Sequence, residues 1–184
     1  VDNKKLKLKN GERFSRSLGE LRIKHKGKLE KIIILAHLKS KHSSEEDFQG
    51  WSKRGEEVRG LNRHIQHLQA SLKNPKIILA GDMNSDLEDL KIMGLANLDN
   101  FLDLKKLGDE EKCTHIHFDG KRRYHQFDYI FSTENMRDEL DLEKSFVYRF
   151  KNDYGDVVDF PESIKEKLQN PSDHYPCLLY TSPS

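Results

Sequence analysis

The sequence predicts an α/β fold, because two apolar strands are joined through one long helix. Residues 31–38 and 76–80 are short β-branched and apolar runs, typical of strands buried on both faces of a sheet. Between them, apolar residues recur every three or four positions from Val58 to Leu72, which indicates a surface helix. Strand, helix and strand form a βαβ-like crossover, and if the strands are parallel their carboxyl ends meet at one edge of the sheet.

The other elements follow from shorter patterns. Residues 18–23 are expected to pair with 31–38 as a hairpin, and Ser43 and Glu46 have capping-box spacing. Short helices are expected from Asp86 through Met93 and at residues 161–168. Further strands are expected on either side of residues 119–123 and near the end of the chain, at 113–118, 127–132, 145–150 and 177–180. Neither a repeat nor a linker interrupts the chain, so residues 1–184 are expected to form one domain, with 181–184 as a disordered tail.

Composition limits the class of protein. The 184 residues fit one domain with its own core. Lysine plus arginine (32) nearly balances aspartate plus glutamate (31), so only a local basic patch would bind nucleic acid. No apolar run approaches the roughly 18 residues that span a bilayer, so a soluble protein is expected, either cytoplasmic or secreted. Cys113 and Cys177 allow at most one disulfide and have no metal-binding spacing.

Polar side chains stand beside the ends of four predicted strands. They are His37, Asp82 with Asn84, Asp128, and Asp173 with His174. Each has a plain structural explanation on its own, such as an Asp-x-Asn turn that closes a core strand. Asp128, however, stands among apolar residues and needs a hydrogen-bonding partner if it is buried. Together, two imidazoles, three carboxylates and one amide suit metal-assisted attack on a phosphate.

Three other kinds of functional site fit the sequence less well than a phosphate-hydrolysing metal site. A calcium-binding EF-hand loop starting at Asp82 fails because Leu87 replaces the required glycine and Met93 the bidentate glutamate. A serine hydrolase fails because the sequence has no Gly-x-Ser-x-Gly elbow. A zinc site of His115, His117 and His125 has no cysteine or carboxylate spacing to support it, and strand His-x-His pairs are often plain surface.

Four short motifs occur in a specific order. They are His-Leu-Lys-Ser at 37–40, Gly-Asp-Met-Asn at 81–84, Phe-Asp-Tyr-Ile-Phe at 127–131 and Ser-Asp-His-Tyr-Pro at 172–176. This order resembles the endonuclease/exonuclease/phosphatase superfamily, the group of deoxyribonuclease I, abasic-site endonucleases, sphingomyelinases and inositol-polyphosphate 5-phosphatases. The resemblance implies a four-layer α/β/β/α sandwich, of which this chain supplies mainly the C-terminal half.

The resemblance also implies roles for individual residues. Asp82 would orient or deprotonate the attacking water, and Asn84 would hydrogen-bond the nucleophile or a phosphate oxygen. His174 would contact the scissile phosphate, with Asp128 behind it to fix its tautomer. His37 would be a phosphate contact or general acid on the other side. Further phosphate contacts would come from Lys39 and Ser40.

The metal site would be incomplete in this chain. Asp173 would join the metal shell, with Mg²⁺ as the expected ion and Mn²⁺ or Ca²⁺ as alternatives, because carboxylates, amide and water suit a hard cation. The superfamily's metal-binding glutamate has no counterpart before His37, although Glu12, Glu20 and Glu30 are present. The expected partner is therefore the N-terminal half of the same domain, missing here or on another polypeptide.

Two classes of phosphate-bearing substrate are compatible with the sequence. The basic run at 121–125, including Arg122 and Arg123, would bind a nucleic-acid backbone or a polyphosphate headgroup if it rims the site. A solvated hairpin tip explains it equally well. A nuclease-type phosphodiesterase is favoured, with a phosphoinositide or sphingolipid phosphoesterase as the alternative. A non-catalytic half-domain that binds a partner is the alternative from a different class.

Overall fold

A computed structural model describes residues 8–9, 11–42, 44–105 and 107–181. Its centre is a five-stranded sheet in the order β1-β2-β3-β7-β4. These strands span Gly19–His25, Lys28–His37, Lys76–Asp82, Asp128–Ser132 and Asp99–Asn100, respectively. β2 and β3 are parallel and the other pairs are antiparallel. The hairpin and the parallel crossover expected from the sequence are thus confirmed.

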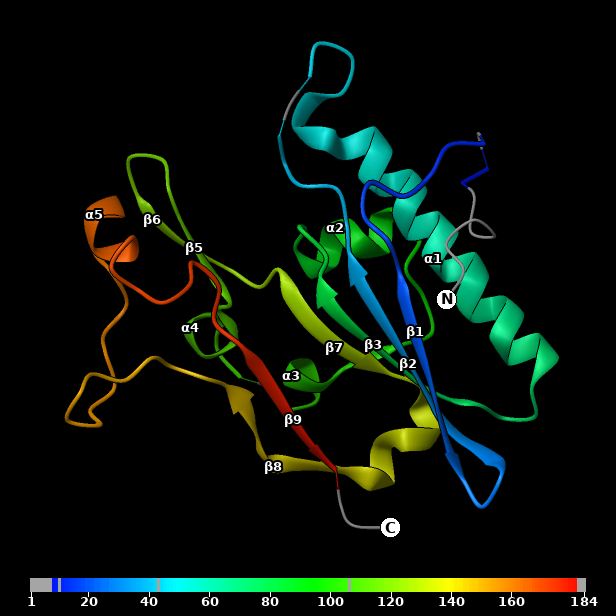
Figure 1. Cartoon of the computed structure of the whole chain (residues 1–184). Helices are drawn as coiled ribbons and strands as arrows, with labels where there is room; N and C mark the ends of the chain where they lie inside the picture. Colours follow the sequence, from blue (N-terminus) through cyan, green and yellow to red (C-terminus); the bar gives the residue numbers. More distant parts are fainter. Residues whose placement is uncertain (1–7, 10, 43, 106, 182–184) are drawn as a thin grey trace.

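The long helix α1 (Trp51–Ser71) covers one face of this sheet, together with the short helix α2 (Leu87–Ile92) (Figure 1). Alternate strand residues, among them Ile34 and Leu79, meet the apolar stripe of α1 in the larger core. α1 begins at Trp51, well before the apolar repeat at Val58. Its first turns bury the polar residues Arg54 and Glu57, both 1% exposed, so the apolar pattern does not reveal them.

A second β layer packs on the opposite face, over β7. It consists of two antiparallel strand pairs, β5 (His115–Phe118) with β6 (Arg122–His125), and β8 (Leu140–Val147) with β9 (Cys177–Thr181). Their core contains Phe101, Ile116 and Tyr175, and Ile130 of β7 packs against it. Helix against sheet against β layer is the α/β packing that the resemblance implies.

Short helical segments connect the strands. They are η2 (Phe48–Gly50), α3 (Phe101–Leu104), α4 (Asp109–Lys112), η3 (Glu134–Glu139) and α5 (Ile164–Lys167). In the described part of the chain no helix is long and apolar enough to cross a membrane. Cys113 and Cys177 are both free thiols, and burial raises the pKa of Cys177 to about 12.

Several element boundaries differ from the sequence predictions. β6 begins at Arg122, inside the segment 119–123 expected to separate two strands, because residues 122–125 complete the ladder with β5. The strand expected at 145–150 starts earlier, at Leu140, and ends at Val147. The helix expected at 161–168 is only Ile164–Lys167. β9 includes Thr181, the first residue of the expected tail; residues 182–184, and Ser43 of the expected capping box, lie outside the described residues.

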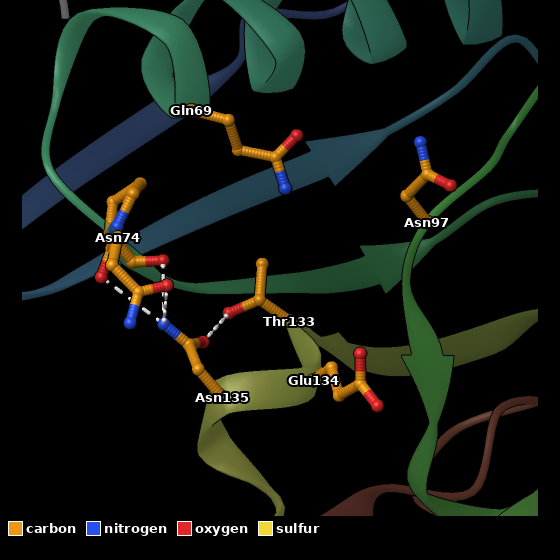
Figure 2. Close-up of a pocket in the computed structure, with 7 residues that line it drawn as sticks. Gln69, Asn74, Asn97, Thr133, Glu134 and Asn135 are labelled. Carbon is orange, nitrogen blue, oxygen red and sulfur yellow. Dashed lines mark hydrogen bonds between the residues drawn. The ribbon is translucent and has the colours of Figure 1, made fainter.

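Hydrogen bonds of one asparagine hold the turn between α1 and β3 (Figure 2). The Asn135 amide donates to the backbone oxygen and the side-chain oxygen of Asn74, at 3.2 and 3.0 Å, and its own oxygen accepts from Thr133. Gln69 and Asn97 face the same space from opposite walls of a cavity of about 460 Å³. These contacts fix the start of β3, at the end opposite the polar cluster.

Candidate active site

Three predicted site residues lie in a row across adjacent strands. His37 of β2 pairs in register with Asp82 of β3, and Asp82 pairs with Asp128 of β7. Strand residues two apart share a face, so these side chains lie on the face of the sheet that carries the second β layer. The parallel pairing of β2 and β3, on which the sequence argument depended, thus places the first two at one edge.

The backbone turns sharply where β3 ends. Gly81 has φ 137°, and a Cβ there would lie 1.9 Å from the carbonyl oxygen of Ala36 on β2. Only glycine permits this close approach of the two strands. Asn84 also has a positive φ, 50°, and its backbone N–H donates to the Asp82 carboxylate at 2.8 Å. The Asp-x-Asn pair therefore forms a local turn that fixes the Asp82 side chain.

Asp82 is largely enclosed, with 15% of its side chain exposed. The Asn84 amide donates to its Oδ2 at 3.1 Å, and to the carbonyl of Leu38 at 3.0 Å. The His37 Nε2 lies 3.3 Å from the same oxygen. Burial raises the pKa of Asp82, and the negative charge of Asp128 raises it further, against the hydrogen bond from Asn84. A carboxylate with a raised pKa is suited to accept a proton.

His174 is oriented by Asp128. Its Nδ1–H donates to the Asp128 Oδ2 at 2.6 Å, which gives this half-buried aspartate the partner that the sequence argument demanded. This hydrogen bond raises the pKa of His174, against the effect of burial. The remaining ring nitrogen, Nε2, is left for another partner.

His115 is a site residue that the sequence argument did not place here. Its ring lies 4.8 Å from that of His174 and stacks on Phe127 at 5.2 Å. Burial, reinforced by the charge of Lys167, lowers the pKa of His115 to about 3, so the ring is neutral. Its Nε2 accepts from the Lys167 ammonium at 3.0 Å, which leaves the proton on Nδ1.

A second carboxylate–imidazole pair flanks the site. The His125 Nδ1 lies 3.1 Å from Asp86, and the His125 ring stacks on Phe127 at 4.8 Å. Lys41 is 3.8 Å from Asp86 and 4.5 Å from the centre of the Phe127 ring. Burial alone would raise the pKa of Asp86, but the hydrogen bond with His125 lowers it. The sequence offered no signal for this pair, because it depends on the β5–β6 register.

The first turns of α1 brace the loops that carry the site. The Glu57 carboxylate accepts from the backbone N–H of Lys39 at 2.7 Å. Arg54 donates to the Ser85 hydroxyl at 2.7 Å and to the Lys39 carbonyl at 3.1 Å. The buried polar residues that hid the start of α1 therefore tie the loops after β2 and β3 to one helix.

The basic residues expected to contact phosphate, Lys39, Arg122 and Arg123, lie in three different surroundings. The Lys39 ammonium donates to the carbonyls of Ser40 and His42, both at 3.3 Å. Arg122 lies on the face of β6 turned away from His115 and His125, over the Tyr124 ring. Arg123 shares the face of those histidines but pairs with Asp119 at 3.0 Å. None of these cations makes a direct contact with Asp82 among the hydrogen bonds and ion pairs of the described residues.

Two groups of possible metal ligands overlap at His174. In one, ligand atoms of Asp82, Asp128 and His174 lie within 4.8 Å of one another; in the other, those of His115, Asp173 and His174 do. The first group suits a cation, since its two carboxylates repel each other. In the second, Asp173 is 62% exposed and the Lys167 ammonium already lies 3.9 Å from it. Asp173 thus sits beside the two-carboxylate group rather than within it.

The described residues before His37 supply no further carboxylate to this group. Glu12 pairs with Lys53, Glu20 with Arg22 and His64, and Glu30 with Lys31. Mg²⁺ takes about six oxygen ligands, so the oxygens present here would make up part of its coordination shell.

The fold was compared with known proteins. No family model and no curated sequence matches the chain. Among solved structures, a humanized TDP2 of D. rerio has 18% identity and a TM-score of 0.58, covering 90% of this chain and 61% of that one. The human nocturnin catalytic domain has 16% identity and a TM-score of 0.54, covering 96% and 57%.

A third similar structure is that of beta toxin 275-280 from Staphylococcus aureus, at 17% identity and a TM-score of 0.54, covering 94% of this chain and 59% of that one. This chain therefore spans about three fifths of each of these three proteins. The order of elements, the row of polar strand ends and these likenesses agree: the chain has the DNase I-like fold of these structures.

Proposed function

We propose that this chain carries the catalytic edge of a metal-dependent phosphoesterase that hydrolyses a phosphodiester, of nuclease type, by in-line attack of an activated water. The observation that carries the proposal is the convergence of Asp82, Asp128 and His174 within 4.8 Å, with His37 beside them. These groups supply a base, an oriented imidazole and a concentration of negative charge at one point.

Each residue has a task that follows from its contacts. Asp82, with its raised pKa and a side chain fixed by Asn84, orients the water and accepts its proton. His174, held by Asp128 and with a raised pKa, presents a protonated Nε2–H to a phosphate oxygen. His37, half exposed at the other side of Asp82, would contact a second oxygen or protonate the leaving group; its 3.3 Å approach to Asp82 supports this role.

A divalent cation fits this charge distribution. Asp128 would hold it, with Asp173 close by and Asp82 beside it as the base, and when bound it would neutralise charge that develops on the phosphate. Mg²⁺ is proposed because the donors are carboxylates. In support, a beta toxin variant of similar fold has been solved with bound magnesium ions.

The remaining ligands and part of the sandwich are proposed to come from the N-terminal half of the same domain. Two leucines on the second face of the main sheet, Leu21 and Leu35, are 56% and 54% exposed. They lie on β1 and β2, beyond the part of the sheet over which the second β layer packs. That half, with its metal-binding glutamate, would cover this apolar area.

Nucleic acid is the proposed substrate class. A TDP2 of D. rerio with a similar fold has been solved in complex with a single-strand DNA product. On the site's own rim, Lys41, His125 and Arg123 add basic groups. Phosphoinositide and sphingolipid phosphodiesters remain the alternatives within the superfamily, and a non-catalytic binding module is the alternative outside it.

An activity assay tests the proposal. The protein containing this chain should nick supercoiled plasmid with Mg²⁺ and stop when the metal is chelated. Asp82→Asn and His174→Ala should each lower the rate at least 100-fold, because each removes a group that acts in the transition state. Ile92→Ser, at an isoleucine 73% exposed on α2, is the control and should leave the rate unchanged.

The outcomes separate the alternatives. Hydrolysis of sphingomyelin or an inositol phosphate with plasmid left intact would assign the lipid or headgroup class. Nicking at the full rate by Asp82→Asn would refute the mechanism. A protein that binds DNA without cleaving any of these phosphodiesters would be the binding module.

A further inference from the structure

A pocket of about 440 Å³ opens beside the candidate active site, between β5 and α5. Asp173 and Lys167 line its inner side, next to His174 and His115. Its outer wall is apolar and is formed by Phe118, Ile164 and Leu168. None of the tasks proposed above for the catalytic residues uses this space.

The pocket is continuous with the reaction centre. His174 belongs both to the group with Asp82 and Asp128 and to the group with His115 and Asp173, and the ligand atoms within each group lie within 4.8 Å of one another. A phosphate bound at Asp82 and Asp128 would therefore be separated from the pocket only by the His174 side chain. A substituent esterified to that phosphate can enter the pocket without leaving the site.

The inner side of the pocket is fixed in place. The Lys167 ammonium donates to the Ile116 carbonyl at 2.7 Å and to His115 at 3.0 Å, and it lies 3.9 Å from Asp173. These contacts tie α5 to β5. The Asn170 amide donates to the Tyr175 hydroxyl at 3.3 Å, which holds the chain that leads from α5 to His174.

Two of the three apolar side chains in the wall are largely exposed to solvent. Ile164 is 59% exposed and Leu168 is 79% exposed, and both flank the same pocket. Exposed apolar side chains that gather at a cleft mark a binding surface more often than isolated ones do. Four of the seven lining residues, His117, Lys167, Asn170 and Asp173, are polar, so the wall is mixed.

We propose that this pocket is the subsite for the nucleobase of the nucleotide next to the scissile phosphodiester. The inference rests on the proposed function and names its substrate more closely. A base has flat apolar faces, which suit Ile164, Leu168 and the exposed ring of His117, and polar edges, which suit the Asn170 amide.

An acyl chain fits the pocket less well. It would displace water from the exposed Asp173 carboxylate and from the Asn170 amide without offering either group a hydrogen bond, and this loss of hydration weakens binding. A base replaces the water on these groups with donors and acceptors of its own. The mixed wall therefore favours the nucleotide over the lipid.

Binding of small phosphates tests the subsite. With Mg²⁺ present, thymidine 5′- or 3′-monophosphate should bind roughly 5- to 150-fold more tightly than 2-deoxyribose 5-phosphate, since stacking contributes about 1–3 kcal/mol per base. Leu168→Ser and Ile164→Ser should remove most of that ratio and leave the affinity for the sugar phosphate unchanged. Ile92→Ser, another exposed isoleucine, should preserve the ratio.

The possible results are distinct. Equal affinity for nucleotide and sugar phosphate, in a protein that still nicks plasmid, overturns the subsite and leaves the proposed function standing. Octyl phosphate that binds more tightly than either nucleotide, and loses this advantage in Leu168→Ser, overturns the nucleobase in favour of an acyl chain. Absence of both phosphate binding and hydrolysis overturns the proposed function and the subsite together.

Discussion

The two aspartates at the centre of the site differ in their surroundings and therefore in their chemistry. The Asp82 carboxylate accepts hydrogen bonds from Asn84 in the turn that follows β3. Burial, together with the nearby charge of Asp128, raises the pKa of Asp82. Asp128 instead accepts the hydrogen bond of His174 and raises the pKa of that imidazole. One carboxylate is thus prepared to take up a proton, and the other to keep a proton on its neighbour.

The substitution Asp128→Asn tests this division of roles. Without the carboxylate, the pKa of His174 should fall toward or below its ordinary value of about 6.5, and the pKa of Asp82 should fall because a negative neighbour is gone. Because His174 has a raised pKa in the folded state, its contribution to stability is present below about pH 6.5 and is lost as the pH rises through the folded-state pKa. NMR titration of the His174 ring, with urea unfolding at pH 5.5 and 8.5, measures both effects.

The second carboxylate–imidazole pair supplies the matched control. Asp86→Asn removes the partner of His125 and leaves the Asp128–His174 hydrogen bond in place. It should leave the His174 titration where it is in the unmodified protein. A shift of His174 as large as that in Asp128→Asn would mean that the field of the whole site, rather than one hydrogen bond, sets this pKa.

At the scale of elements, the sequence predicts the parts that repeat and misses the parts that depend on pairing. The apolar strands β2 and β3 and the stripe from Val58 to Leu72 follow directly from composition and period. β6 does not, because Arg122–His125 is polar and basic and becomes a strand only through its ladder with β5. The start of α1 is hidden for a related reason, since Arg54 and Glu57 are buried by hydrogen bonds to loops that are remote in sequence.

The site residues, like the elements, divide into those that local sequence patterns predict and those whose positions depend on long-range pairing. His37, Asp82, Asn84, Asp128 and His174 could be found because motifs place them at strand ends, and the structure brings them together. His115, Lys167 and the Asp86–His125 pair could not, because their positions depend on the β5–β6 register and on the docking of α5. No local pattern in the sequence encodes either of these.

The contact between β2 and β3 at Gly81 gives a prediction at the scale of elements. In Gly81→Ala the new methyl group would meet the Ala36 carbonyl at 1.9 Å, at a φ of 137°. The strands must separate, so the free energy of unfolding should drop by more than about 2 kcal/mol. Denaturation in urea measures it. Gly120→Ala, with a φ of 82° and open space around it, is the control and should cost about 1 kcal/mol.

Comparison of the two variants isolates the steric effect. Both place alanine at a positive φ, but 137° at Gly81 is more strained for an L-residue than 82° at Gly120, so the difference between them reports the clash with β2 together with this additional backbone strain. Losses of equal size would show that the strands adjust to the methyl group. In that case the approach of β2 to β3 would not be what fixes Asp82 beside His37.

At the scale of the whole molecule, the two faces of the main sheet are covered unequally. α1 and α2 bury one face in the larger core, whereas the second β layer packs on the other face at β7 (Figure 1). Leu21 and Leu35 lie on that second face, on β1 and β2, and more than half of each is exposed. An apolar area on a sheet next to the proposed active site is the place where a further part of the sandwich would pack.

Exposure of this area should be measurable in the isolated 184-residue chain. Leu21→Thr combined with Leu35→Thr keeps residues that favour strands and removes two large apolar side chains from the open face. Binding of a hydrophobic dye and association at high concentration should both decrease, and the free energy of unfolding should change by less than about 1 kcal/mol, because exposed substitutions are usually small in effect. Ile92→Thr, on the helix side of the sheet, should leave dye binding unchanged. If the double variant binds as much dye as the unmodified chain, the open face is not the adhesive surface, and the case for a covering N-terminal half weakens.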